Sequence, residues 1–241
     1  MLDNAVRRLP HEELDPTALA ERVAKDGYVY VTGIPEEFDH AAWLAEHVGP
    51  LMEQYDGRTV WSIKADQRYD GVYHSLNNKP LTPHTECYEW TGLPPRHLAL
   101  WCVVPGDGEG GQTTLGDGFA FLDTLSAADR AAMATRVWDF VSSAGLQEMQ
   151  LGRTARHPML ERRAGLPPVL RFTCRCIADP DGDPFLTEIR ERLVRFFDDT
   201  RVAVTFERNA LLVWDNHRML HSRTGYSDLR RHLRRVWLAE H

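Results

Sequence analysis

The sequence lacks the features of membrane, secreted and nucleic-acid-binding proteins. No apolar run approaches the roughly 18–20 residues of a membrane span, and Met1–Ala20 is too polar and charged for a signal peptide. The net charge of −7 does not favour nucleic acid or an anionic membrane as a partner. We therefore expect a cytoplasmic protein that binds neither.

Cysteine is also scarce, since the chain has four and no two of them form a Cys-x-x-Cys pair. Known zinc spacings are therefore missing, which argues against a structural zinc site. Cys174 and Cys176 lie two residues apart in an apolar run, where a strand would place them on one face. We expect the four cysteines to be reduced and structural.

The chain lacks an internal repeat, a low-complexity tract and a linker, so residues 1–241 are predicted to form a single domain. Strands are predicted at residues 28–31, 97–104, 113–115, 137–141, 169–177, 202–206, 210–214 and 233–238. Helices are predicted at residues 16–25, 41–47, 119–135 (as two short helices) and 184–197. This pattern predicts an all-β core with flanking helices, in the form of a double-stranded β-helix (jelly roll, cupin-like).

Two segments carry residues typical of a metal site. In Pro83-His84-Thr85-Glu86 an imidazole and a carboxylate are two residues apart, so an extended chain points both to the same side. His221 ends the second segment, which begins at Trp214, and can complete a triad of two histidines and one carboxylate. That geometry is diagnostic of non-haem iron(II) oxygenases and leaves positions for a 2-oxo acid and dioxygen. Taken alone, the first segment also fits an exposed loop.

The same region lacks the residues of a zinc protease. His217 and His221 have the spacing of the two histidines in a His-Glu-x-x-His helix, but Arg218 stands where the catalytic glutamate would be. A 2-oxo acid with a second carboxylate also needs a cation, and arginine binds carboxylates through two parallel hydrogen bonds. Arg231 and Arg235 are four residues apart and share a face on a strand, although a solvated basic strand has the same pattern.

Taken together and in order, these segments resemble the taurine dioxygenase (TauD/TfdA) superfamily, including its clavaminate-synthase-like branch. The family has a His-x-Asp/Glu pair, a strand, a Gly-Gly-x-Thr motif, a Trp/Phe-Asp-Asn segment ending in histidine, and a later arginine. This sequence supplies Gly110-Gly111-Gln112-Thr113 and Trp214-Asp215-Asn216 at the matching places. The resemblance covers roughly residues 25 to 240.

The resemblance implies an Fe(II) site with 2-oxoglutarate and O2 as co-substrates. The implied iron ligands are His84, Glu86 and His221. The resemblance implies that the Thr113 hydroxyl contacts 2-oxoglutarate, that Arg231 pairs with its distal carboxylate, and that Arg235 lies near its metal-binding end. The roles of the two arginines could be exchanged, because the loop after His221 is short.

The carboxylate ligand is glutamate here, whereas aspartate is commoner in the family. The clavaminate-synthase-like amino-acid hydroxylases share the His-Thr-Glu variant, so Glu86 points to an amino-acid-like substrate. Related halogenases have glycine or alanine at this position, which makes chlorination unexpected. In the resembled family, residues around the pair line the substrate pocket; here they are Tyr73, His74, Asn77, Asn78, Tyr88 and Trp90.

These polar and aromatic residues fit a small polar molecule. Lys79 is the one fixed cation in that segment, which disfavours a sulfonate unless Arg96 or Arg153 reaches in. We expect hydroxylation, desaturation or cyclisation of an amino-acid-like substrate, free or presented by a carrier protein, in specialised biosynthesis. The alternatives are a catabolic dioxygenase for a small organic acid or sulfonate, and a non-catalytic cupin-like binding protein. The second alternative would be expected to lose a site residue, and none is lost. The sequence does not indicate an oligomeric state.

Overall fold

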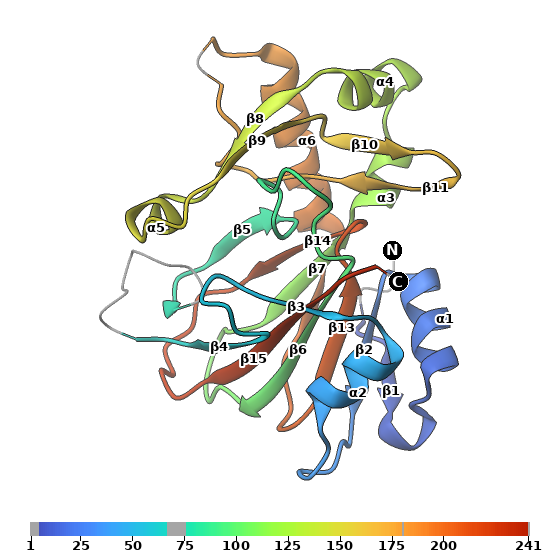
Figure 1. The fold of residues 1–241 in the computed structure, drawn as a ribbon, viewed down its shortest axis with the longest axis vertical. Coiled ribbons are helices and arrows are strands. Elements are labelled where there is room, and N and C mark those ends of the chain that lie inside the picture. The colour runs from blue at the N-terminus through green and yellow to red at the C-terminus, as the bar shows by residue number, and fades with distance from the viewer. Residues whose placement is uncertain (1–4, 67–75, 180, 241) are drawn as a thin grey trace.

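Two main sheets, two small two-stranded sheets and six α-helices make up the computed structural model, which describes residues 5–66, 76–179 and 181–240. The larger sheet has seven strands in the order β1-β2-β13-β6-β15-β3, with β4 also paired to β15. The smaller sheet has the order β12-β7-β14-β5. Every pairing is antiparallel except that of β1 with β2. Two separate hairpins, β8-β9 and β10-β11, lie at the end of the molecule beside α6 (Figure 1).

The strands and helices have the following bounds. The larger sheet contains β1 Arg8–Pro10, β2 Tyr28–Thr32, β3 Leu51–Met52, β4 Val60–Lys64, β6 His97–Val104, β13 Leu211–Asp215 and β15 His232–Leu238. The smaller sheet contains β5 Leu81–His84, β7 Thr113–Asp117, β12 Val202–Val204 and β14 Met219–Arg223. The hairpin strands are β8 Trp138–Val141, β9 Thr154–His157, β10 Leu160–Arg163 and β11 Leu166–Leu170. The helices are α1 Pro16–Asp26, α2 His40–His47, α3 Gly118–Asp123, α4 Ala127–Thr135, α5 Ala144–Glu148 and α6 Pro184–Thr200, with a 3-10 turn at His11–Glu13.

The apolar run of β6 is continuous because both faces of the larger sheet are covered. Leu98 and Leu100 point into a core shared with Leu115 of the smaller sheet. The alternate residues Ala99 and Trp101 point the other way, into a second core that α1 and α2 complete. The two sheets therefore pack against each other through one face of β6, and helices cover its other face (Figure 1).

The helices begin where the sequence places capping residues. The Asp15 side chain accepts hydrogen bonds from Thr17 N and Ala18 N at the start of α1, which ends at Gly27 in the left-handed region at φ 80°. Asp183 caps α6 in the same way. None of the described helices is both long enough and apolar enough to cross a membrane.

Most predicted elements are confirmed, including α1, α2, β6, the pair α3 and α4, and α6. The predicted strand 169–177 is wrong beyond Leu170, because the fully buried Arg171 turns toward the carbonyls of Tyr88, Trp90 and Gly92. Cys174 and Cys176 therefore do not share a strand face. The prediction also missed β14, although this strand carries His221.

Phe197 tests the packing of α6 on the smaller sheet. Its ring is fully buried and lies against the backbone of Gly116 in β7, where an added Cβ would come within 2.5 Å of it. We expect Phe197→Ala to lower the free energy of unfolding by about 3–5 kcal/mol, measured by chemical denaturation. Phe196→Ala, at the half-buried preceding position, is the control and should lower the free energy of unfolding less. Equal losses in the two variants would contradict this packing.

Candidate metal centre and co-substrate cavity

Strand pairing brings two distant histidines together. In the β5–β14 ladder His84 lies directly opposite His221, and their ring centroids are 4.2 Å apart. Such directly opposed residues on one face of an antiparallel pair are close neighbours. The 137-residue gap between them in the sequence is thus closed by backbone hydrogen bonds rather than by a local motif.

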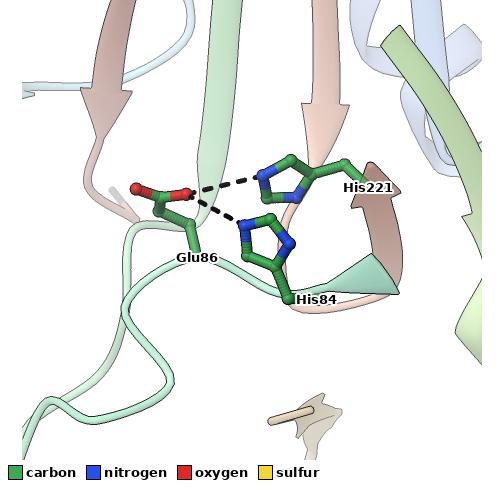
Figure 2. A group of neighbouring side chains, drawn as sticks. All are labelled: His84, Glu86 and His221. Atoms are coloured by element: carbon green, nitrogen blue, oxygen red, sulfur yellow. Dashed lines mark ion pairs between the residues drawn. The ribbon is translucent and has the colours of Figure 1, made fainter. Parts of the chain in front are cut away.

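Glu86 completes the group, and its carboxylate points at both imidazoles (Figure 2). Glu86 Oε2 lies 3.9 Å from His84 Nε2 and 3.4 Å from His221 Nε2. All three ligand atoms lie within 4.8 Å of one another. Atoms that each bind one metal ion at about 2.0–2.2 Å have separations of this size. The expected convergence of the pair and the remote histidine is confirmed, and the donor set fits Fe(II).

The tautomer of His84 is set by its backbone neighbour. His84 Nδ1 lies 2.8 Å from Thr82 O, and a carbonyl only accepts, so Nδ1 carries the proton. Nε2 is then left with its lone pair on the side of Glu86, as a metal ligand requires. Thr85 is not part of the ligand set, since its hydroxyl accepts from Phe172 N.

The Asn216 side chain holds the backbone of Glu86. Asn216 is fully buried, its Oδ1 accepts from Glu86 N at 2.7 Å, and its Nδ2 donates to Glu86 O at 3.2 Å and to Pro95 O at 3.0 Å. Trp214 packs beside His221, with ring centroids 5.2 Å apart. The Trp-Asp-Asn segment thus contacts two of the three ligands from the end of β13 and the start of the turn that leads to β14.

His217 belongs to the support of this turn and not to the metal group. It is fully buried, its Nε2 donates to Pro94 O at 3.0 Å, and its Nδ1 accepts from Arg96 at 3.2 Å. Burial lowers the pKa of His217 to about 4, which keeps it in this neutral form. Arg96 also pairs with Asp215 at 2.7 Å, so it does not reach the cavity.

The charge of Glu86 is balanced by a cation as well as by the histidines. Arg235 Nη1 donates to Glu86 Oε1 at 2.9 Å, and Arg235 Nε donates to Gln54 Oε1 at 2.9 Å. Burial raises the pKa of Glu86, but Arg235 and the two histidines outweigh burial and bring it down to about 2. Glu86 is therefore an ionised carboxylate, the form that binds a metal ion.

A cavity of about 490 Å³ adjoins the three ligands and is lined by strands of both sheets. Arg231 and Thr113 both line it and are 3% and 4% exposed. Neither terminal nitrogen of Arg231 makes a hydrogen bond to any described residue. Such orphaned, buried donors fit a carboxylate, which would accept from both nitrogens at once. The residues present therefore suit the distal end of 2-oxoglutarate.

The Gly-Gly-x-Thr motif makes room for Arg231. A Cβ on Gly111 would lie 2.9 Å from Arg231 Nε and 3.0 Å from its Cδ. A Cβ on Gly110 would collide with the backbone carbonyl of Gly225, and both glycines have positive φ, 85° and 71°. The absence of a side chain at Gly111 thus leaves space for Arg231, which lies 120 residues further along the chain.

Sequence reasoning missed several residues of this site. Arg223 is two residues after His221 on β14, so it faces the same cavity, and burial lowers its pKa to about 10. Arg175 and Glu89 also line the cavity. Lys79 is exposed and does not line it, so the earlier choice of Lys79 as the nearby cation is wrong. Had β14 been predicted, the alternation of side chains along a strand would have placed Arg223 on the same face as His221.

The expected substrate-lining residues fall into three groups. Tyr88 lines the cavity. Three others, Asn77, Asn78 and Trp90, do not line the cavity. Asn77 accepts a hydrogen bond from Arg223, and Asn78 donates one to Tyr226 O. The Trp90 ring packs on Trp237. The other two, Tyr73 and His74, lie outside the described residues.

A His-Glu-His group beside a cavity between two antiparallel sheets defines a non-haem Fe(II)- and 2-oxoglutarate-dependent oxygenase, and this protein is one. Within that class the chain belongs to the TauD/TfdA family, because the family described as taurine catabolism dioxygenase TauD, TfdA family, matches residues 6–237. That family has the double-stranded β-helix fold. No curated protein sequence matches the chain.

Solved structures similar to this chain include three oxygenases. An asparagine oxygenase in complex with Fe(II), a 3-hydroxyasparagine and succinate has a TM-score of 0.76 and 17% identity, over 93% of this chain and 78% of its own. The non-heme iron oxygenase OrfP with Fe, succinate and a dihydroxyarginine has a TM-score of 0.73 and 20% identity, over 93% and 80%. PvcB of Pseudomonas aeruginosa has a TM-score of 0.68 and 20% identity, over 94% and 80%. At these identities the likenesses establish the fold.

Asn216→Ala tests how the Trp-Asp-Asn segment acts. The variant leaves the buried N–H and C=O of Glu86 without partners, so we expect iron affinity to fall by roughly 10- to 100-fold. Anaerobic Fe(II) titration measures this directly. Asn209→Ala is the control, because its amide joins backbone carbonyls near Ile34, away from the metal group. Unchanged iron affinity in a folded Asn216→Ala protein would show that the amide does not position Glu86.

Proposed function

We propose that this oxygenase hydroxylates an amino-acid-like substrate, free or presented on a carrier, with desaturation or cyclisation as variants of the same chemistry. The observation that carries the proposal is the intact His-Glu-His group opening onto a cavity of about 490 Å³ with polar groups on its wall. Clefts of roughly 300–1,000 Å³ are typical of small-molecule sites. A role in specialised biosynthesis belongs to this proposal.

The 2-oxoglutarate site is assigned to the two cavity arginines in distinct roles. Neither terminal nitrogen of Arg231 has a hydrogen-bond partner among the described residues, and Arg231 and Thr113 both line the cavity, so we assign both to the distal carboxylate. Arg235 already donates hydrogen bonds to Glu86 and Gln54, so we assign it to the metal-binding end of 2-oxoglutarate. This division supports the assignment of Arg231 to the distal carboxylate and of Arg235 to the metal-binding end, rather than the exchanged one.

The reaction combines substrate, dioxygen and 2-oxoglutarate to give hydroxylated substrate, succinate and carbon dioxide. Bound Fe(II) supplies the activation of dioxygen, with 2-oxoglutarate as the electron-donating co-substrate. His84, Glu86 and His221 would hold the metal by three positions and leave the others for 2-oxoglutarate and dioxygen. Glu86 would take the position that a halogenase leaves to chloride, so chlorination is not part of this proposal.

The substrate class draws on the charges of the cavity and on similar structures. Asparagine oxygenase and OrfP hold hydroxylated asparagine and arginine in their structures. Here Tyr88, Glu89 and Ser143 add hydrogen-bonding groups to the cavity wall. Arg175, an exposed residue that also lines the cavity, favours a small organic acid or sulfonate, which is the second candidate.

The architecture expected from the sequence is part of the same proposal. We assign the two sheets as the halves of a double-stranded β-helix within a single domain that spans the chain. The shared core of Tyr30, Leu100 and Trp237 with Leu115 supports this, because it draws side chains from both sheets.

Arg231→Ala should raise the KM for 2-oxoglutarate by roughly 10- to 100-fold, since it deletes a charge-assisted pair. Steady-state kinetics with varied 2-oxoglutarate measures the change. Arg234→Ala is the matched control, because Arg234 is exposed on the same strand and removes the same charge. If both variants behave alike, Arg231 is not the distal-carboxylate ligand.

Succinate release tests the activity and the substrate class together. We expect one or a few amino acids, free or as pantetheine thioesters, to stimulate succinate release from 2-oxoglutarate by the iron-loaded protein. His221→Ala should abolish the stimulated rate by removing a metal ligand. Stimulation by taurine with none by any amino acid would move the assignment to the catabolic alternative. Full activity of His221→Ala would refute the metal site.

A further inference from the structure

Glu89 is a buried carboxylate that the iron and 2-oxoglutarate sites do not use. It is 3% exposed and lines the cavity. Glu89 Oε1 accepts a hydrogen bond from Ser142 Oγ at 3.1 Å, and the carboxylate forms no ion pair with any described residue. An ionised carboxylate buried without a cation is strongly destabilised. A bound molecule that brings a positive charge would remove that penalty.

A turn places Glu89 on the same cavity as the metal ligand Glu86. In an extended strand, residues three apart point to opposite faces. Here residues 86–89 form a turn, with Cys87 in the left-handed region at φ 56° and Trp90 N donating to Cys87 O at 3.1 Å. Glu86 and Glu89 both line the cavity as a result. A molecule that contacts Glu89 would therefore also lie near the metal group.

The neighbours of Glu89 separate it from the 2-oxoglutarate end of the cavity. Arg231 packs on Gly111, Gly106 and Tyr226. Glu89 instead contacts Ser142 in the segment between β8 and α5, and Leu146 of α5 also lines the cavity.

The charges around Glu89 favour a cation over an anion. Burial raises the pKa of Glu89, and the nearby charge of Glu86 adds to this rise, so further negative charge is disfavoured there. Arg153 opposes the rise, but it is exposed, lies over the Trp90 ring at 5.1 Å and does not line the cavity. Arg153 therefore leaves the cavity side of the carboxylate open to a ligand.

We propose that Glu89 is the specificity-determining residue that binds a cationic group, an ammonium, amidinium or guanidinium, on the side chain of the substrate. This deepens the proposed function and rests on it for the amino-acid part of the substrate. The Ser142 hydroxyl holds one carboxylate oxygen in place, and the substrate cation donates to the carboxylate from the cavity. Neutral side chains of the same shape bind more weakly because they leave the charge unpaired.

Charge-matched pairs of amino acids test the proposal. The iron- and 2-oxoglutarate-loaded protein is offered L-arginine against L-citrulline, and L-ornithine and L-lysine against L-glutamine, each free and as a pantetheine thioester. Agmatine, which lacks the carboxylate, is included. We expect a cationic member to stimulate succinate release best, and Glu89→Gln to raise its KM by roughly 10- to 100-fold with little change for the neutral partner. Anaerobic calorimetry should show the same loss in binding.

Two controls separate recognition from a structural role. Ser142→Ala removes the hydrogen bond but keeps the charge, so the preference for the cationic member should persist. Glu148→Gln removes an exposed charge on α5 and should leave the KM unchanged for both the cationic and the neutral member of a pair. Equal losses for both members of a pair in Glu89→Gln would mean that Glu89 only supports the fold, and would overturn the proposal.

The remaining outcomes distinguish this proposal from the proposed function. Stimulation by neutral amino acids alone overturns the role of Glu89 and leaves the amino-acid assignment standing. In another outcome, agmatine alone stimulates succinate release, with no effect of any amino acid or thioester. If Glu89→Gln abolishes that stimulation, the result supports the role of Glu89 and overturns the amino-acid assignment. No stimulation by any of these compounds overturns both.

Discussion

The metal centre depends on the amide of Asn216. This one side chain satisfies the N–H and the C=O of Glu86, both in the turn that follows β5. Asn216 itself lies in the turn between β13 and β14, so the strand before it belongs to the larger sheet and the strand after it to the smaller. The amide therefore ties the carboxylate ligand to the point where the chain passes from one sheet to the other, close to the strand that carries His221.

Buried charge is the second constraint on the cavity. Arg223, Arg231 and Arg235 are each at most 6% exposed, and Glu86 is the carboxylate that forms an ion pair with one of them. Burial lowers the pKa of Arg223 and of Arg231, which shows that their charges are poorly solvated. A dicarboxylate such as 2-oxoglutarate would bring negative charge to Arg231, so we expect co-substrate binding and stability of the cavity to be coupled.

Part of the metal centre and of the residues that we assign to the co-substrate could be predicted because it has a local pattern. His84 and Glu86 are two residues apart in an extended segment, and Gly110-Gly111 is visible as a motif even before its partner Arg231 is known. The fold was predicted where apolar runs or caps are strong, as in β6 and α1. Strand β14 was missed because its residues Met219–Arg223 mix apolar and basic side chains that are all buried, which hides the alternation.

The substrate side of the cavity has no comparable local pattern. If residues 86–89 were an extended strand, the Glu89 side chain would point away from the metal group. The turn at Cys87 instead brings it to the same cavity as Glu86. That turn is held from a distance, since Arg171 donates to the carbonyls of Tyr88 and Trp90 from the segment after β11. A left-handed residue other than glycine persists only when its surroundings hold it there. The residue that we assign to substrate recognition is thus placed by long-range hydrogen bonds, so the same local sequence on another scaffold would present a different cavity wall.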